Sequence, residues 1–544
     1  MRVCTAKQMA AIDAETIKTG IAGHELMERA GLTMTDGILE FLENSAEALE
    51  RQGGARGRVL IICGKGNNGG DGLVVARHLC EAGLSIAVMM LADRDDLSAD
   101  TRRNYDQLPG GVDVLHPARD HWVGAVGPLL DEADVVIDAI FGTGITPPLR
   151  GPYVDLITTV NDSGAPTVAL DIPSGVDGND GRVDPVALAA DLTITVGLPK
   201  RGLLLAPGRD FTGEIQVIDI GFPTEISDRH SSDHHWLSRA DYLGLLPPRP
   251  TNSHKYDFGR VTILAGSRTY GGAAHLAGLG ALRSGVGLVK MAVPLELVES
   301  TRVGLPEALA VGLATTEAGT IEAVPGTMMD HLLANQSAVV LGPGLDANAS
   351  TDEWVTGFLS QLHLPVVVDA DGLGAFARLD AELSFGTGPV VLTPHAGELA
   401  RLTGLDSAEV VARRFELVPE LATRWGVVLM LKGSPSLIAA PDGSLFINPT
   451  GDDALARGGS GDVLSGLIGG LLAQGTPALE AALLGAYVHG LAGTLASENS
   501  SPRSVLVRET AAAVGPVFGA MEKEASSNAH LRNKIWPVSS KEVE

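Results

Sequence analysis

The amino-acid sequence predicts an α/β protein with two domains, the first built on a doubly wound parallel sheet. Three observations support this fold class. The chain has 544 residues, 45% of them hydrophobic, which is too long for one ordinary hydrophobic core. Short apolar runs that end in Gly, Pro or Asp alternate with helical stretches, as in buried parallel strands joined by helices. Two glycine-rich turns, GKGNNGGDG (64–72) and GGSGD (458–462), each open directly into a helix.

The first domain is expected over residues 1–225. Helical spacing of apolar residues predicts helices near 9–17 and 25–42, and a third helix follows the first glycine-rich turn as far as Leu79. Strands are expected within six apolar segments, at 59–63, 85–91, 133–144, 166–175, 192–198 and 214–223. The carboxyl ends of parallel strands meet at one edge of a sheet, which is where ligands bind in such folds.

The alternation lapses at 226–250, a segment that is polar and then proline-rich and is expected to be a linker. Its His230, His234 and His235 offer an alternative as metal ligands, although their spacing defines no coordination geometry. The second domain is expected over 251–522, with strands within 258–267, 285–294, 338–345, 364–373, 388–399 and 426–435. Residues 523–544 are expected to form a polar tail.

Charge and composition narrow the function classes. A formal net charge of −26 argues against non-specific binding to nucleic acid or anionic membranes, because the overall field repels both. Cys4, Cys63 and Cys80 are too few and too scattered for a disulfide framework or a thiolate metal site. Charged residues interrupt the apolar residues of the N-terminus, so no signal peptide is expected. We therefore expect a cytoplasmic protein whose partners are small molecules, with neither nucleic acid nor membrane among them.

The second glycine-rich turn has the composition of a phosphoryl-transfer site. Gly458, Gly459 and Gly461 allow backbone N–H groups to approach an anion, and Asp462 follows in the first turn of the helix. A carboxylate there fits a general base that deprotonates a substrate hydroxyl while the backbone amides neutralise the transferred phosphoryl group. The alternative is an acidic residue that only complements the helix dipole.

Six segments of the second domain resemble the ribokinase-like superfamily and, within it, the ADP/ATP-dependent NAD(P)H-hydrate dehydratases. They are 253–289, LGPGL (341–345), VVDADGL (367–373), LTPHAGELARL (392–402), LKGSPSLIA (431–439) and GGSGDVLSGLI (458–468). The resemblance implies a ribokinase-like α/β domain in which a hydrated dinucleotide contacts Ala273, Gly344, His395 and Asp462. It also implies Mg²⁺ as a cofactor and ADP bound by Lys432, Gly433, Ser434, Pro435, Ser436 and Gly461.

Four of these residues also have a structural interpretation. Ala273 and Gly344 fit ordinary turns, and His395 fits a loop histidine. Lys432 ends an apolar run, so its side chain fits one that only reaches solvent past the end of a strand.

The segment GDDALAR (451–457), just before the second turn, departs from the pattern of that family. It carries Asp452 and Asp453, and two extra carboxylates beside a bound phosphate need a cation to be tolerated. We expect Mg²⁺ or the guanidinium of Arg457 to neutralise them.

The first glycine-rich turn lacks both the GxGxxG pattern and the Lys-Ser/Thr pair of a P-loop. Its paired asparagines offer amide oxygens, which suit a weakly held monovalent cation beside a phosphate. Three oxygen-bearing side chains, those of Asn68, Asp138 and Ser174, lie at the ends of expected strands. We expect them to converge on one ion at the carboxyl edge of the sheet.

This domain resembles the NAD(P)H-hydrate epimerase family, from IDAETIKTGIAGHELMERAG (12–31) to GLPKRGLLLAPG (197–208). The resemblance implies a Rossmann-like sheet with K⁺ at Asn68, Asp138 and Ser174. It assigns substrate contacts to Asn67, Asn68, Gly69, Gly70, Asp71, Gly142, Thr143, Gly144, Ile145, Thr146, Pro147, Pro148 and Asp171. Asp171 is the candidate acid/base, with a helix or turn cap as its alternative, and Asp71 also fits a helix cap. Lys200 is a second candidate, although a surface lysine in a loop is the commoner case.

The two halves together resemble a family of bifunctional enzymes that repair hydrated NADH and NADPH, in which water has added across a ring double bond. The resemblance implies epimerisation of the R and S hydrates in the first domain. Nucleotide-dependent dehydration of the S hydrate, with release of AMP and phosphate, is implied for the second domain. We favour ADP over ATP as the phosphoryl donor and expect a homo-oligomer.

Two alternatives from other classes stay open at this point. One is a vitamin-type small-molecule kinase whose first domain is a non-catalytic scaffold. The other is a scaffold in an RNA-processing assembly, against which the presence of Asn68, Asp138, Asp171 and Ser174 and the acidic surface argue.

Overall fold

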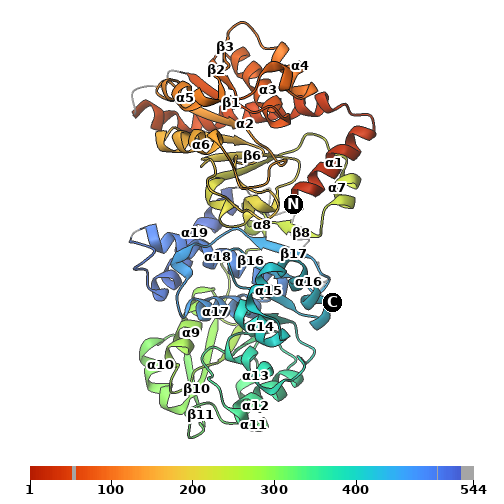
Figure 1. Cartoon of the computed structure of the whole chain (residues 1–544). Helices are drawn as coiled ribbons and strands as arrows, with labels where there is room; N and C mark the ends of the chain where they lie inside the picture. Colours follow the sequence, from red (N-terminus) through yellow and green to blue (C-terminus); the bar gives the residue numbers. More distant parts are fainter. Residues whose placement is uncertain (52–56, 499, 528–544) are drawn as a thin grey trace, which may run out of the picture. The chain divides into compact units, whose positions relative to one another are not determined.

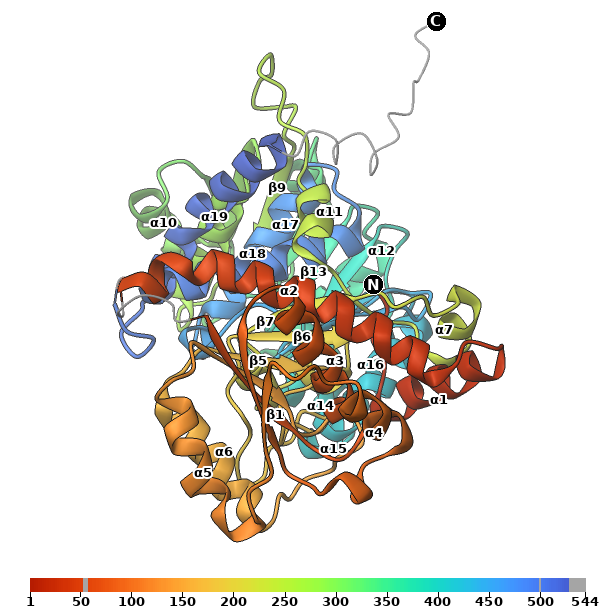
Figure 2. The same ribbon diagram turned by 90° about the horizontal axis from the view of Figure 1, so that it is seen from above.

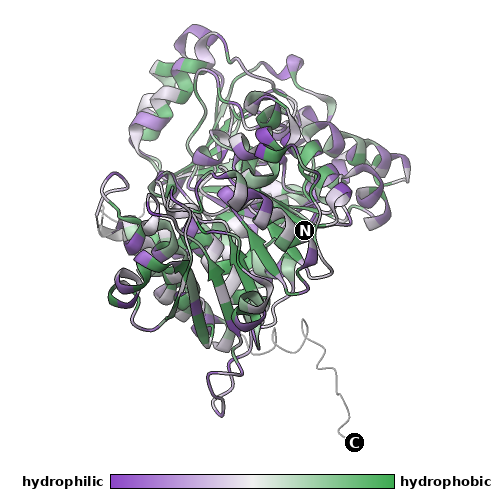
Figure 3. Ribbon diagram, turned by 90° about the horizontal axis from the view of Figure 1, so that it is seen from below, coloured by the Kyte–Doolittle hydropathy of each residue, from purple (hydrophilic) through white to green (hydrophobic). Residues whose placement is uncertain are grey.

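The computed structural model describes residues 1–51, 57–498 and 500–527. The chain divides into two compact units, Met1–His234 and His235–Glu544, each with its own sheet (Figure 1). The strands appear mostly green in Figure 3 because their residues are predominantly apolar, as expected for sheets covered on both faces.

The first unit is built on a seven-stranded sheet in which every neighbouring pair of strands is parallel. The chain winds outward from β1 in both directions, so the predicted doubly wound sheet is confirmed. β3 was not predicted, because it lies at the edge and only one of its four residues is fully buried. The strands lie in the order β3 (Val112–Leu115), β2 (Ser85–Met90), β1 (Arg58–Cys63), β4 (Val135–Ala139), β5 (Thr167–Leu170), β6 (Leu192–Val196) and β7 (Glu214–Ile218).

Helices cover both faces of this sheet. Figure 2 shows α5 and α6 on one side of the strands and α2, α3 and α4 on the other. Met34 and Leu73 pack in the core of one face, and Trp122 and Leu156 pack in the core of the other. The helices of this unit are α1 (Ala6–Lys18), α2 (Gly23–Arg51), α3 (Asn67–Glu81), α4 (Ala99–Asp106), α5 (Trp122–Leu130), α6 (Pro152–Ser163) and α7 (Thr224–His230).

The second unit is built on a ten-stranded sheet. Its strands are parallel from β11 to β15, and β16 and β17 continue the sheet as an antiparallel hairpin. All six predicted strands are present, and β8, β11, β16 and β17 are additional. The order is β11 (Leu309–Leu313), β10 (Leu288–Pro294), β9 (Arg260–Leu264), β12 (Ala338–Leu341), β13 (Val366–Val368), β14 (Val390–Leu392), β15 (Val428–Leu431), β16 (Ser436–Ala439), β17 (Leu445–Asn448) and β8 (His234–Trp236).

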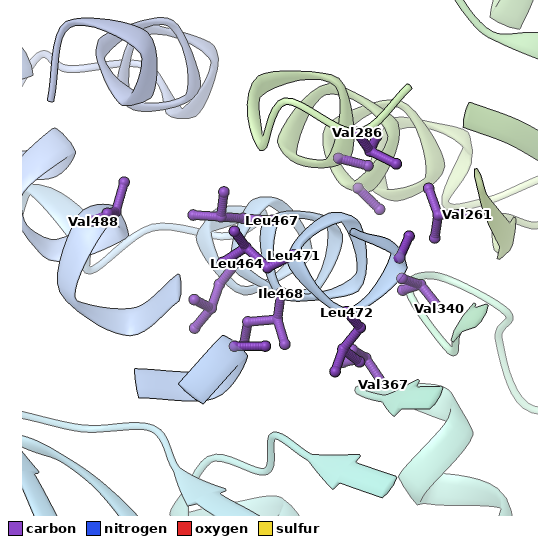
Figure 4. Close-up of a cluster of buried hydrophobic side chains, with 14 of the residues drawn as sticks. Val261, Val286, Val340, Val367, Leu464, Leu467, Ile468, Leu471, Leu472 and Val488 are labelled. Atoms are coloured by element: carbon purple, nitrogen blue, oxygen red, sulfur yellow. The ribbon is translucent and has the colours of Figure 1, made fainter. Parts of the chain in front are cut away.

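Helix α17, which carries the second glycine-rich turn at its start, is the most buried helix of this unit. Its Leu467, Ile468 and Leu471 are fully buried, and it lies beside the valines of β9, β12 and β13 (Figure 4). The helices are α8 (Arg239–Gly244), α9 (Gly271–Arg283), α10 (Val298–Gly304), α11 (Gly326–Leu333), α12 (Ala349–Gln361), α13 (Asp371–Leu379), α14 (Ala396–Thr403), α15 (Ser407–Ala412), α16 (Arg414–Trp425), α17 (Ser460–Ala473), α18 (Ala478–Glu498) and α19 (Val507–Ser527).

The segment 226–250 has regular structure instead of forming an irregular linker. It contains most of α7, all of β8 and all of α8. A reciprocal capping box between Ser238 and Asp241 begins α8, and Tyr242 is fully buried with its ring stacked 3.7 Å from that of Tyr487. Such a short helix has little periodicity of its own, and its packing against distant residues is not visible in the sequence.

The histidines of this segment have other contacts. His230 pairs with Glu15 at 2.5 Å, and the ring of His235 stacks on that of Phe446. The described part of the chain contains no cluster of three or more His, Cys, Asp or Glu side chains able to hold a metal ion.

The C-terminal boundary also differs from the prediction. Helix α19 continues to Ser527 with Ala525 buried, so the first five residues of the expected tail are helical, and 528–544 lie outside the described residues. Helix α18 has the length and apolar composition of a membrane span, but 67% of its most apolar stretch is buried inside the protein, as in a core helix.

Close packing of α9 against α17 generates a prediction about stability. A Cβ atom on Gly466 would lie 1.9 Å from the carbonyl oxygen of Ala277, so Gly466→Ala is expected to destabilise the second unit by about 1–3 kcal/mol. Gly357→Ala in α12 is the matched control, because a Cβ there meets no atom within 4 Å; it should stabilise the helix by up to about 1 kcal/mol. Differential scanning calorimetry should show melting temperatures shifted in opposite directions, and equal shifts would contradict the packing.

Candidate functional sites

The carboxyl edge of the first sheet gathers residues that the sequence separates by more than a hundred positions. The turn after β1 leads to Asn68 in α3, β4 contains Asp138, Asp171 follows β5, and Lys200 follows β6. These four strands are consecutive in the sheet and parallel, so their ends lie side by side. The sheet edge at which Asn68, Asp138 and Ser174 were expected to meet is therefore formed by the ends of these strands.

Asp138 and Ser174 form one hydrogen-bonded group. Ser174 Oγ donates to Asp138 Oδ1 at 2.7 Å, and the backbone N–H of Ser174 donates to Oδ2 at 2.7 Å. Burial raises the pKa of Asp138 to about 6, although the hydrogen bonds from Ser174 oppose the shift. No lysine, arginine or histidine in the described part of the chain pairs with this carboxyl group.

Asn68 joins the same group through Phe141. Its Nδ2 donates to the carbonyl oxygen of Phe141 at 2.9 Å, and the N–H of Phe141 donates to Ser174 Oγ at 2.9 Å. The other atom of the amide, Oδ1, is buried and has no hydrogen-bond partner among the described residues. A buried oxygen without a donor, next to a buried carboxyl group without a cation, is a donor set that fits a monovalent cation.

A cavity of about 580 Å³ opens at this edge. Of the residues expected to contact substrate, those that line it are Asn67, Asn68, Asp71, Gly142, Thr143, Gly144, Ile145 and Asp171. The described lining does not include Gly69, Gly70, Thr146, Pro147 or Pro148, whose contacts with substrate stay predictions. Gly69 has a packing role instead, because a Cβ there would lie 2.0 Å from the carbonyl oxygen of Gly64.

Asp171 and Lys200 form an ion pair in the wall of this cavity. Lys200 is fully buried, and its Nζ donates to Asp171 Oδ1 at 2.5 Å, to the carbonyl oxygen of Val196 at 2.7 Å and to Thr195 Oγ1 at 3.0 Å. The interpretation of Lys200 as a surface loop lysine is therefore wrong. Asp171 has a φ of +67°, a left-handed conformation that is uncommon for a residue with a side chain and is often found at functional sites.

The second unit repeats this arrangement with other residues. Lys432, directly after β15, donates from Nζ to Oδ1 of Asp369 at 2.6 Å. Asp369 follows β13, is 1% exposed, and accepts a further hydrogen bond at Oδ2 from Ser465 Oγ of α17. The ammonium group of Lys432 is thus held inside the site and does not reach out to solvent, which excludes the snorkelling interpretation.

Asp462 lies in the first turn of α17, beside the ion pair. A Cβ atom on the preceding Gly461 would lie 3.1 Å from Lys432 Nζ, so the backbone of the turn passes next to the ammonium group. Burial raises the pKa of Asp462 to about 7, with a further upward contribution from Asp369 and an opposing one from Lys432. A carboxyl group with such a pKa exchanges protons readily near neutral pH, which is the property of a general base.

His395, one of the residues expected to contact the hydrated dinucleotide, lies next to Lys432. The backbones of His395 and Lys432 form a parallel bridge, and Nδ1 of His395 accepts from the N–H groups of Gly397 and Glu398 at 3.0 and 3.2 Å. His395 is thus the N-cap of α14, with a side chain that is half exposed. Gly344 lies against Ala273, because a Cβ atom on Gly344 would come 2.8 Å from that of Ala273.

Gly433, Ser434 and Ser436 line a small crevice of about 80 Å³, whose wall includes Asp452. Asp452 Oδ1 accepts from the N–H of Ala454 at 3.0 Å, and Oδ2 accepts from Thr494 Oγ1 at 2.7 Å. Arg457 Nη2 donates to the carbonyl oxygen of Pro502 at 2.8 Å. Among the residues that the structure describes, Arg457 forms no ion pair with Asp452 or Asp453. Its predicted role as their counterion is therefore not supported.

Sequence reasoning missed three residues of these sites. Asp369 lies within the quoted VVDADGL segment, and its position at a strand end was a signal that went unused. Glu398 lies 3.9 Å from Lys432 Nζ. His489 is buried near Ser460, and burial lowers its pKa to about 4, so it is neutral at pH 7; its sequence context in a long apolar helix gives no signal.

Comparisons with known proteins agree with this geometry. Residues 23–202 match the family described as YjeF-related protein N-terminus, and residues 261–514 match the family described as NAD(P)H-hydrate dehydratase. The bifunctional NAD(P)H-hydrate repair enzyme of Moorella thermoacetica is 38% identical over 97% of this chain and 98% of its own length. The enzyme of the same name from Thermofilum pendens is 36% identical over 92% of both chains.

A solved structure is similar to about half of the chain. It is the ADP/ATP-dependent NAD(P)H-hydrate dehydratase of Bacillus subtilis, co-crystallised with ATP and Mg²⁺. Its sequence is 34% identical, and the match covers 52% of this chain and 97% of that one, with a TM-score of 0.46.

These matches extend over both units and therefore over both carboxyl-edge sites. They do not support a vitamin-type kinase with a scaffold domain, because relatives with the same two-part organisation are repair enzymes. The first unit carries the epimerase domain and the second carries the nucleotide-dependent dehydratase domain. The chain belongs to the family of bifunctional NAD(P)H-hydrate repair enzymes.

Proposed function

We propose that the two activities are performed at the two carboxyl-edge sites, with Asp171 as acid/base for epimerisation and Asp462 as base for dehydration. The observation that carries the proposal is the paired arrangement of a buried lysine–carboxylate ion pair beside a further acidic side chain in each unit. In both sites the lysine holds one carboxylate in place, and in the first unit a cavity lies next to the ion pair.

In the dehydratase, Asp462 accepts the proton of the hydroxyl group on the S hydrate while that oxygen attacks the terminal phosphoryl group of the nucleotide. The N–H groups of Gly459 and Gly461, together with Lys432, would neutralise the transferred group. The phosphorylated carbon then loses phosphate and the adjacent ring carbon loses a proton to solvent, which restores the ring double bond of the dihydropyridine. Phosphate leaves far more easily than hydroxide, which gives the reason for consuming a nucleotide.

The phosphoryl donor is proposed to be ADP, with AMP as the product, and Mg²⁺ is proposed to accompany it. The relative from Bacillus subtilis is named as ADP/ATP-dependent and was crystallised with ATP and Mg²⁺. In the described part of the chain no three carboxylates or histidines form a metal-binding cluster, which fits an ion held mainly by the nucleotide phosphates.

K⁺ is proposed to bind in the epimerase between Asn68, Asp138 and Ser174. The unpartnered Oδ1 of Asn68 and the buried Asp138 carboxyl group are the support for this site. The ion would supply a fixed positive charge beside the cavity. A cytoplasmic location and a homo-oligomeric state stay predictions.

Substitution of the proposed base tests the division of labour between the sites. Asp462→Asn should reduce dehydration by at least about 100-fold, because proton removal contributes about 10²–10⁴ to such rates, and should leave epimerisation unchanged. Absorbance at 340 nm measures dehydration, and chromatography of the R and S hydrates measures epimerisation. Asp330→Asn, at an exposed position of α11, is the control. Loss of both activities in a folded Asp462→Asn protein would contradict two independent sites.

The raised pKa of Asp462 predicts a pH dependence. The base works in its ionised form, which is the minor form below a pKa of about 7 and the major form above it. We expect kcat/KM for dehydration to rise about tenfold per pH unit below that value and to level off above it. Initial rates measured between pH 5.5 and 8.5 with saturating nucleotide give the profile. A rate that is flat, or that falls over this range, would argue against Asp462 as the base.

The proposed K⁺ site is tested by exchange of the cation. Replacing K⁺ with N-methylglucamine should slow epimerisation by the unsubstituted protein. The epimerisation rate of the Asp138→Asn variant should not depend on the cation, because that variant lacks the buried negative charge. The rate of R/S interconversion above the spontaneous background is the measurement. Equal rates with and without K⁺ in the unsubstituted protein would refute the site.

A further inference from the structure

The cavity of the first unit contains two carboxyl groups in opposite environments. Asp71 lies in the first turns of α3, after β1, and Asp171 follows β5. Both line the same cavity. Because β4 separates β1 from β5, the two backbone positions start from strands about 10 Å apart. The two side chains therefore reach the cavity from segments that follow non-adjacent strands of the sheet.

Asp171 has the environment of an ionised carboxylate. Its Oδ1 accepts hydrogen bonds from Lys200 Nζ at 2.5 Å and from Thr195 Oγ1 and the N–H of Val196 at 3.3 Å. Its Oδ2 accepts no hydrogen bond from the residues that the structure describes, and it lies beside Gly142, where a Cβ atom would come within 3.4 Å. One oxygen is therefore fixed by three donors, while the other faces the cavity.

Asp71 has the environment of a neutral carboxyl group. It forms no hydrogen bond or ion pair through its side chain with any residue in the described part of the chain. Helix α2 packs directly on its backbone, since a Cβ atom on Gly31 would lie 3.5 Å from the carbonyl oxygen of Asp71. Met27 and Leu26 of the same helix supply apolar lining to the cavity.

The charges around Asp71 add to this effect. Burial raises its pKa well above the usual value, Asp171 and Asp13 of α1 raise it further, and Lys200 opposes them. The other charged residues in the cavity lining are Asp100 of α4 and Lys65 of the glycine-rich turn.

We propose that Asp71 is a second catalytic residue of the epimerase, the proton donor that works across the cavity from Asp171. The inference rests on the proposed role of Asp171 as the opposing base. It assigns the two carboxyl groups to the two faces of the hydrated ring, as inversion at one carbon requires.

The reaction balances with water as the only other participant. The carboxyl proton of Asp71 passes to the hydroxyl oxygen of the substrate, the carbon–oxygen bond breaks, and the lone pair of the adjacent ring nitrogen forms a C=N bond as water leaves. A water molecule then adds to the opposite face, the C=N electron pair returns to nitrogen, and Asp171 accepts the proton of the water. The reverse direction uses protonated Asp171 as donor and ionised Asp71 as acceptor, so the two residues exchange roles.

The test compares Asp71→Asn, Asp71→Glu and Asp171→Asn in the full chain, with Asp36→Asn at an exposed position of α2 as control. Interconversion of the R and S forms of NADPH hydrate is followed without nucleotide. We expect Asp71→Asn to lower kcat for epimerisation by about 100-fold or more with little change in KM, and Asp71→Glu to restore part of it. Dehydration of the S form, which reports a folded chain, should not change.

Several outcomes would overturn the inference. Full epimerisation by Asp71→Asn while Asp171→Asn is inactive would refute the role of Asp71 as proton donor but not the role of Asp171. Full epimerisation by Asp171→Asn would refute the role of Asp171 as the base. A raised KM with unchanged kcat would show that Asp71 only binds substrate. If Asp71→Asn does not fold, the unsubstituted enzyme decides: in H₂¹⁸O each inversion should introduce one labelled oxygen, and the rate should fall as the pH rises past the raised pKa of Asp71. Inversion without label, or a rate that stays constant at high pH, would refute the proposal.

Discussion

Burial of carboxylates at the carboxyl edge of a parallel sheet is the constraint on which both sites depend. Removing an ionised carboxylate from water costs several kcal/mol, so each must find a cation, a set of donors or a proton. In each unit a lysine supplies the cation for one buried carboxylate: Lys200 pairs with Asp171, and Lys432 pairs with Asp369. Each lysine comes from a loop that follows a different strand from that of its partner, so the ion pair also fixes the two loops relative to each other.

Three other carboxyl groups at these sites form no ion pair with a lysine, and a different role is proposed for each. Asp138, Asp71 and Asp462 all have raised pKa values, chiefly because of burial. In the proposed mechanisms, Asp138 holds a monovalent cation, Asp71 donates a proton, and Asp462 takes a proton from a substrate hydroxyl group. The desolvation of a buried carboxylate is therefore compensated in three different ways, and each way corresponds to a different chemical role.

Most of the strands could be predicted from the sequence, but the ion pairs between the loops that follow them could not. Strand ends such as those at Asp138, Asp171 and Lys432 could be predicted because apolar runs and glycine-rich turns are local features. Lys200 could not be distinguished from a surface lysine, since its partner lies 29 residues away across a neighbouring strand. The edge strand β3 and the hairpin strands β16 and β17 are short, and the helix α8 depends on stacking between Tyr242 and a residue far along the chain. Local patterns contain none of these long-range contacts.

The measurement that tests the central claim most directly is the extent of NADPH recovery from a mixture of R and S NADPH hydrates. The purified chain is incubated with nucleotide, Mg²⁺ and K⁺, and absorbance at 340 nm is followed to its end point on a timescale shorter than spontaneous epimerisation. If both sites are active in one chain, the whole mixture returns to NADPH. Recovery that stops at the initial S fraction would show that the first site does not epimerise and would contradict the account.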